Sequence, residues 1–133
     1  MEHRPVRMVR VHCPVAPATL AAMLAGDADA ADRDPALARI LAVIRADNPL
    51  GMIGAYEGVA EIGFGFETFR PGPAADPVLG QAGRTSMSPT VIVTSYAPAD
   101  ADLAPVLAAL LDAHPWETPM IEIALTELVL RSA

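Results

Sequence analysis

The amino-acid sequence predicts an α+β fold in which a four-stranded antiparallel sheet is covered by helices on one face. Three observations support this. With 133 residues, of which 53% are hydrophobic, the chain is long enough for one domain with a buried core. Apolar residues at strand spacing alternate along the chain with apolar residues at helix spacing. The resulting order is strand, helix, strand, loop or hairpin, strand, helix, strand, which is the ferredoxin-like βαββαβ pattern.

The first part of the chain predicts one strand and two helical runs. Residues 6–15 alternate as a strand, and Pro17 opens a short helix. The acidic residues 26–34 are expected to form a solvated loop or a frayed helix. Asp34-Pro35 is a strong helix start, with the aspartate as N-cap. The helix that follows carries one apolar stripe, made of Leu37, Ile40, Leu41 and Ile44.

The middle of the chain is rich in turn-forming residues. Asn-Pro-Leu-Gly at residues 48–51 ends the helix, and residues 52–61 alternate weakly as a second strand. Residues 63–83 interleave glycines and prolines with all three phenylalanines of the chain. We expect an extra hairpin or long structured loop here, with a small apolar cluster of its own.

The last part of the chain predicts strand, helix and strand again. Residues 89–96 form the third strand, Asp100 or Asp102 caps the next helix, and residues 120–130 form the final strand. The helix has an apolar stripe of Leu103, Leu107, Leu110 and Leu111. Both faces of the final strand carry apolar residues. A sheet face left in water would therefore be an apolar patch, so we expect subunits to associate.

Composition excludes several classes of protein. Nine basic against sixteen acidic residues give a net charge of -7, which disfavours a nucleic-acid partner. No apolar stretch is long enough to span a membrane, and the N-terminus lacks the apolar core of a secretory signal, so we expect a cytoplasmic protein. Cys13, the single cysteine, is expected to be a buried, inert thiol. No phosphate loop, calcium loop or nucleophile–base pair is present, so no enzyme is predicted.

Residues 114–119, His-Pro-Trp-Glu-Thr-Pro, are the most unusual local sequence, and they have two interpretations. In the structural one, His114 ends the helix and Trp116, the only tryptophan, fills a sheet edge or a subunit contact. In the functional one, His114, Glu117 and Glu122 converge as ligands of a divalent metal, because imidazole and carboxylate suit zinc, copper or manganese. The spacing alone favours the structural interpretation.

The same residues resemble the His-Pro-Tyr-Glu-Glu-Pro motif that ends the inserted domain of YqfO-type dinuclear-metal-centre hexameric proteins; a variant occurs in CutA-type divalent-cation tolerance proteins. Ile-Gly-Ala-Tyr at residues 53–56 resembles the Ile-Gly-Asn-Tyr of that domain. The similarity continues at Gly65, Phe69-Arg70-Pro71, Pro77, Leu79-Gly80 and Gly83. After Tyr56 the family has Ser-His-Cys, whereas this chain has Glu57 and then glycine and valine.

The resemblance implies that residues 1–133 are one PII/CutA-like domain, the insert standing alone. It implies a homo-oligomer, with a trimer favoured, and a subunit cleft near Tyr56, Glu57, Trp116 and Glu117 that binds a small ligand. The dinuclear metal centre is not implied, because its ligands lie in flanking domains. Our hypothesis is a non-enzymatic ligand-binding or regulatory protein. The alternatives are a divalent-cation binding and tolerance protein and a structural module that assembles with a partner protein.

Overall fold

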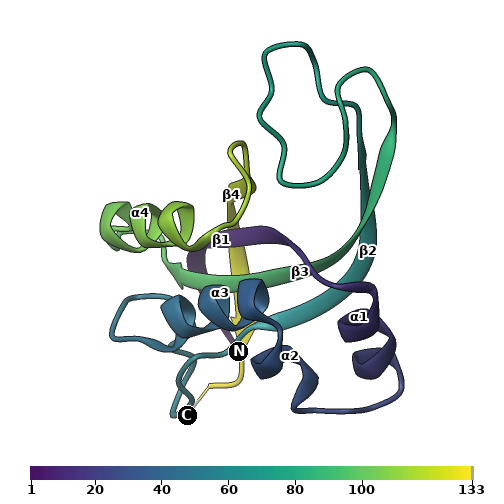
Figure 1. Cartoon of the computed structure of the whole chain (residues 1–133). Helices are drawn as coiled ribbons and strands as arrows, with labels where there is room; N and C mark the ends of the chain where they lie inside the picture. The colour runs from purple at the N-terminus through teal and green to yellow at the C-terminus, as the bar shows by residue number, and fades with distance from the viewer. Residues whose placement is uncertain (133) are drawn as a thin grey trace.

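The computed structural model describes residues 1–132 and has the ferredoxin-like α+β fold that the sequence predicts (Figure 1). Four strands form one antiparallel sheet in the order β2-β3-β1-β4. The strands are β1 (Glu2–Pro14), β2 (Glu61–Phe69), β3 (Ser86–Pro98) and β4 (Met120–Leu130). The helices are α1 (Pro17–Leu24), α2 (Ala30–Arg33), α3 (Pro35–Arg45) and α4 (Ala104–Ala113). No helix of residues 1–132 is long and apolar enough to cross a membrane.

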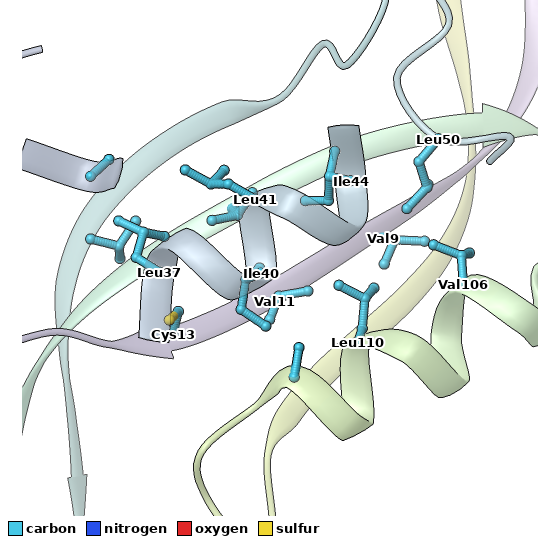
Figure 2. Close-up of a cluster of buried hydrophobic side chains, with 14 of the residues drawn as sticks. Val9, Val11, Cys13, Leu37, Ile40, Leu41, Ile44, Leu50, Val106 and Leu110 are labelled. Carbon is cyan, nitrogen blue, oxygen red and sulfur yellow. The ribbon is translucent and has the colours of Figure 1, made fainter. Parts of the chain in front are cut away.

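The core lies between the sheet and the helices. Alternation along strand β1 turns Val9, Val11 and Cys13 toward the helices. Figure 2 shows Cys13 near Leu37 of α3, and Val11 near Leu110 of α4. The predicted stripe of α3 is confirmed, because all four of its apolar residues are buried. Burying these side chains from two layers is the main favourable contribution to folding.

Cys13 is fully buried, as predicted, and its neighbour His12 points to the opposite face of the sheet. Burial raises the pKa of the Cys13 thiol to about 12, and the negative charge of Asp34 acts in the same direction. The thiol is therefore protonated at neutral pH. A protonated, inaccessible thiol is a poor nucleophile.

The prediction of a strand at residues 52–61 is wrong. Residues 52–60 belong to the α3–β2 loop (residues 46–60), where Gly51, Gly54 and Gly58 adopt positive φ and the chain turns repeatedly, and Glu61 is the first residue of β2. The second strand instead lies in the segment expected to be a hairpin or loop. In β2, the glycines of the sequence occupy one face and Ile62, Phe64 and Phe66 the other. The β2–β3 loop (residues 70–85) is the remaining part of that segment.

Other elements differ from prediction in extent. β1 and β3 are both longer than predicted, because pairing with neighbouring strands extends each of them. The acidic segment contains the short helix α2. In α4 the buried residues are Val106, Leu110 and Ala113, whereas Leu111 of the predicted stripe is exposed. Neither predicted aspartate is the N-cap of α4, but Asp102 Oδ1 accepts a hydrogen bond from the Ala104 amide at 3.1 Å.

The sheet face away from the helices is mixed in character, and not the apolar surface that the sequence predicted. Glu122 of β4 accepts a hydrogen bond from Arg10 (3.4 Å) and pairs with His12 (3.0 Å), both on β1. Among the neighbours on this face, Met120 is exposed. The charged row in the middle of the sheet reduces the apolar area that would need covering.

The α3–β2 loop provides a first testable prediction. A Cβ on Gly51 would lie 2.7 Å from the Val59 amide nitrogen, and Gly51 has a φ of +78°. Gly54 has a φ of +57°, but a Cβ there would meet nothing within 4 Å among residues 1–132 beyond its chain neighbours. We expect Gly54→Ala to lower the free energy of unfolding by about 1 kcal/mol and Gly51→Ala by about 2 kcal/mol. Urea denaturation checks this, and equal losses would show that the Val59 contact carries no cost.

Candidate functional site

The α4–β4 turn (residues 114–119) is organised by His114, which is 6% exposed. His114 Nε2 lies 2.7 Å from the backbone oxygen of His12, and the Trp116 amide donates to His114 Nδ1 at 3.1 Å. Nε2 therefore carries the proton, because a carbonyl oxygen only accepts, and Nδ1 is the acceptor. Burial lowers the pKa of His114, while the His12 hydrogen bond and the charge of Glu67 oppose this shift. A neutral imidazole thus fixes the turn to β1.

Trp116 and Glu117 join this turn to the β2–β3 loop. The Trp116 ring packs edge-to-face on Phe69, the last residue of β2, with ring centroids 5.2 Å apart. Glu117 Oε1 accepts a hydrogen bond of 2.8 Å from the Asp76 amide in the loop. The loop closes on itself through the Gly83 amide, which donates to the Pro71 oxygen at 2.9 Å. Two segments far apart in sequence are therefore held side by side.

A cleft of about 260 Å³, here called the Trp116 cleft, lies between these two segments. In Figure 1 the β2–β3 loop rises at the top of the molecule beside the start of β4. The cleft is mostly apolar, with few charged groups, which is typical of a small-molecule site. It is lined by Glu67, Phe69, Arg70, Pro71, Gly72, Ala75, Pro77, Val78, Leu79, Trp116, Glu117 and Thr118.

Three charged side chains line the Trp116 cleft. Glu67 and Arg70 make neither an ion pair nor a side-chain hydrogen bond within residues 1–132, whereas Glu117 accepts from the Asp76 amide. Glu67 is half-buried on β2, close enough to His114 for its charge to affect that imidazole. Arg70 is exposed and directly follows the last residue of β2. Both side chains are therefore free to interact with charged groups of a ligand.

The structure separates the four predicted ligand-binding residues into two groups. Trp116 and Glu117 line the Trp116 cleft. Tyr56 and Glu57, both exposed, lie in the α3–β2 loop, at the other end of β3. That loop is held there by the Gly51 amide, which donates to the Tyr96 oxygen at 2.9 Å. Within one subunit the two groups do not meet, and Figure 1 shows the α3–β2 loop near the chain termini.

The three predicted metal ligands are not brought together in one chain either. Both ring nitrogens of His114 are occupied by backbone groups, and Glu117 holds the Asp76 amide. Glu122 lies on the open sheet face, where the hydrogen bond from His12 and the charge of Arg10 lower its pKa. No group of three or more His, Cys, Asp or Glu side chains that could hold a metal ion occurs among residues 1–132.

Glu67 and Arg70 line the cleft but are not among the site residues that the sequence predicts. A sequence signal for them exists. Phe69-Arg70-Pro71 is part of the family resemblance, so Arg70 lies in a matched motif. Without the register of β2 against β3, however, nothing connects these residues to Trp116.

Comparison with known proteins shows a similarity in fold to a solved structure. No family model matches the sequence, and no curated protein matches it either. Among solved structures, the chain is similar to a Bacillus cereus protein related to NIF3, with a TM-score of 0.62 and 17% sequence identity. The match covers 95% of this chain and 27% of that protein, so the chain spans about a quarter of its length. At this identity the likeness shows that the chain shares a fold with part of a NIF3-related protein.

Proposed function

We propose that the chain is a non-enzymatic, homo-oligomeric binding protein of the PII/CutA-like kind. In this proposal it corresponds to the inserted domain of the NIF3-related proteins, associates through the two edge strands of its sheet, and takes a small ligand in the Trp116 cleft. The fold shared with part of a NIF3-related protein supports the first point. The mostly apolar cleft, in which Glu67 and Arg70 make no ion pair or side-chain hydrogen bond within residues 1–132, supports the last.

The observation that carries the proposal is the apolar surface on both edge strands. Phe64 and Phe66 of β2 are 45% and 62% exposed, and Leu125 and Val129 of β4 are 76% and 63% exposed. The register of the sheet turns all four toward the helix side, where the helices leave the outer strands uncovered. Water-exposed apolar groups of this size are typical of protein–protein contacts.

The same strands have unpaired edges. β2 and β4 end the sheet of residues 1–132, so one side of each presents backbone N–H and C=O groups with no neighbouring strand. In this proposal the β4 edge of one copy pairs with the β2 edge of the next copy. Contacts between two different edges are head-to-tail, and such contacts form a ring when the rotation between copies closes. A trimer is the ring size that the family resemblance favours.

Native mass spectrometry of the purified protein tests this assembly. We expect the wild-type protein to be a trimer. Phe66→Glu and Leu125→Glu place a charge on the β2 and β4 edges, and each is expected to shift the mass to that of the monomer. Val78→Glu is the matched control, because Val78 is equally exposed but lies in the β2–β3 loop.

Three results contradict the proposal. A monomeric wild-type protein removes the oligomer. The wild-type protein could instead be a dimer that Leu125→Glu dissociates and Phe66→Glu leaves intact. That result requires a symmetric β4–β4 contact and excludes a ring of head-to-tail contacts. A trimer that Val78→Glu dissociates as fully as the two edge variants places the contact outside the edges.

A further inference from the structure

We infer that the Trp116 cleft binds a zwitterionic α-amino acid with an apolar or aromatic side chain. This inference rests on the proposed role of the cleft as the ligand site, and it specifies the chemical class of the ligand. Three properties of the cleft lead to it: its apolar wall, its size, and a pair of opposite charges that residues 1–132 leave without ionic partners.

The apolar wall selects the side chain of the ligand. Phe69 and Trp116 provide aromatic surface, and Val78 and Leu79 of the loop are 72% and 44% exposed beside them. A side chain placed here removes apolar area from water on both sides of the contact. The volume of about 260 Å³ lies below the range of roughly 300–1,000 Å³ typical of sites for drug-sized ligands. The ligand is therefore a small molecule of few atoms, such as a single amino acid.

The charged side chains of the cleft select the ammonium and carboxylate groups of the ligand. Glu67 is half-buried and has neither an ion pair nor a hydrogen bond to its side chain within residues 1–132, so it is free to accept from an ammonium group. Arg70 offers a planar set of donors that matches a carboxylate in a bidentate manner. Glu117 is already engaged with the Asp76 amide, which makes it a positioning residue for the loop.

A zwitterion fits this pair better than a simple ion does. An organic anion would pair with Arg70 but would lie in the same cleft as the unpaired carboxylate of Glu67. An organic cation would pair with Glu67 but leave Arg70 without a partner. An α-amino acid carries both charges on one small molecule, so its ammonium group can pair with Glu67 while its carboxylate pairs with Arg70.

The test uses three probes that share a phenyl group: L-phenylalanine, 3-phenylpropanoate and 2-phenylethylammonium. The chain has one tryptophan, so the indole N–H resonance of Trp116 reports binding in the cleft without ambiguity. Titration followed by NMR, with calorimetry beside it, gives the dissociation constants. We expect L-phenylalanine to bind about tenfold more tightly than either simple ion, because it gains one further charge-assisted interaction.

Two variants test the contributions of Arg70 and Glu67 separately. Arg70→Gln is expected to raise the dissociation constants of L-phenylalanine and 3-phenylpropanoate by about tenfold and to leave that of 2-phenylethylammonium unchanged. Glu67→Gln is expected to raise the dissociation constants of L-phenylalanine and 2-phenylethylammonium and to leave that of 3-phenylpropanoate unchanged. Arg84→Gln is the matched control, because Arg84 lies in the same loop but pairs with Gln81 at 3.3 Å and does not line the cleft.

The opposite results overturn the inference. A cleft that binds 2-phenylethylammonium as tightly as L-phenylalanine, with no effect of Arg70→Gln, is an organic-cation site. A Trp116 resonance that none of the probes moves shows that no amino acid binds there. Native mass spectra of the same samples distinguish a failure of this inference from a failure of the proposed assembly. A trimer that binds none of the probes rejects the ligand inference alone. A monomer that binds L-phenylalanine rejects only the ring, because one chain supplies every residue that lines the cleft.

Discussion

Replacing Asp34 by alanine is expected to lower the free energy of unfolding by about 4 kcal/mol. The side chain is 5% exposed and accepts four hydrogen bonds. Its Oδ1 accepts from the amides of Ala36 and Leu37, at 3.1 and 3.2 Å, and so caps α3. Its Oδ2 accepts from the Thr19 hydroxyl at 2.7 Å and from the Ala16 amide at 3.2 Å, where α1 begins.

The size of this effect follows from what alanine leaves behind. Loss of an aspartate N-cap typically costs about 1 kcal/mol, and each buried donor left without an acceptor costs about 1–3 kcal/mol. Because one carboxylate holds the starts of both α1 and α3, the substitution disturbs the whole helical layer over the sheet. Thr19→Val removes one donor of the same network, and we expect it to cost about 1 kcal/mol.

Urea denaturation followed by circular dichroism measures both variants against the wild-type protein. Asp29→Ala is the matched control, since Asp29 precedes α2, is exposed and makes no side-chain cap there. A loss for Asp34→Ala that is no greater than the loss for Thr19→Val would contradict the shared-carboxylate account. The effect would then belong to the Thr19 hydroxyl alone.

The helix that Asp34 caps also shows why part of this fold is predictable. Asp34-Pro35 and the apolar stripe after it are local signals, and both the cap and the buried stripe are present in the structure. The final strand, predicted at residues 120–130, has the bounds of β4. In both cases the residues that determine the element lie within it, so no tertiary information is needed.

The second strand is missed from the sequence for a physical reason. Gly63 and Gly65 occupy alternate positions in β2 and do not adopt positive φ, but in a sequence glycines usually indicate turns. What makes residues 61–69 a strand is the neighbouring β3, whose Val91 and Val93 pair with Phe64 and Ile62. Packing against a partner strand overrides local preference, and a single sequence does not display that partner.

The candidate site is predictable to the same limited degree. The composition of residues 114–119 singles out Trp116 and Glu117, which do line a cleft. Glu67 and Arg70 join them because the sheet register brings the end of β2 beside the α4–β4 turn. Tyr56 is grouped with them by resemblance, and in one chain it lies at the other end of β3. Tyr56 would reach the Trp116 cleft only in an oligomer, from a neighbouring subunit, and that arrangement stays a prediction.

Replacing His114 by alanine is expected to lower the free energy of unfolding by about 3 kcal/mol. The substitution leaves the His12 carbonyl and the Trp116 amide without their partners, and it removes a buried ring whose centroid lies 6.1 Å from that of Trp116. The α4–β4 turn loses its anchor to β1. Trp116 should then become more exposed, which a red shift of its fluorescence would report.

The same histidine makes the free energy of unfolding depend on pH. Nδ1 of His114 accepts a hydrogen bond from the Trp116 amide, and protonation of Nδ1 replaces this acceptor with a second donor. Burial lowers the pKa of His114 below its ordinary value of 6.5. As pH falls through 6.5 the unfolded chain therefore takes up the proton first. The contribution of His114 to stability is complete above this pH and is lost as pH falls toward the lowered pKa of the folded state. The lowered pKa values of the Asp27 and Glu122 carboxyl groups place their titration at more acidic pH.

Urea midpoints measured between about pH 7.5 and 5.5 test this coupling. The wild-type midpoint is expected to fall across this range, and in His114→Gln, whose amide does not titrate, most of the fall should disappear. His3→Gln is the matched control, since the His3 side chain is 57% exposed and lies near Glu127 on the sheet. A pH dependence that His114→Gln retains and His3→Gln abolishes would assign it to the surface pair. The fall would then have no connection with the turn that positions Trp116.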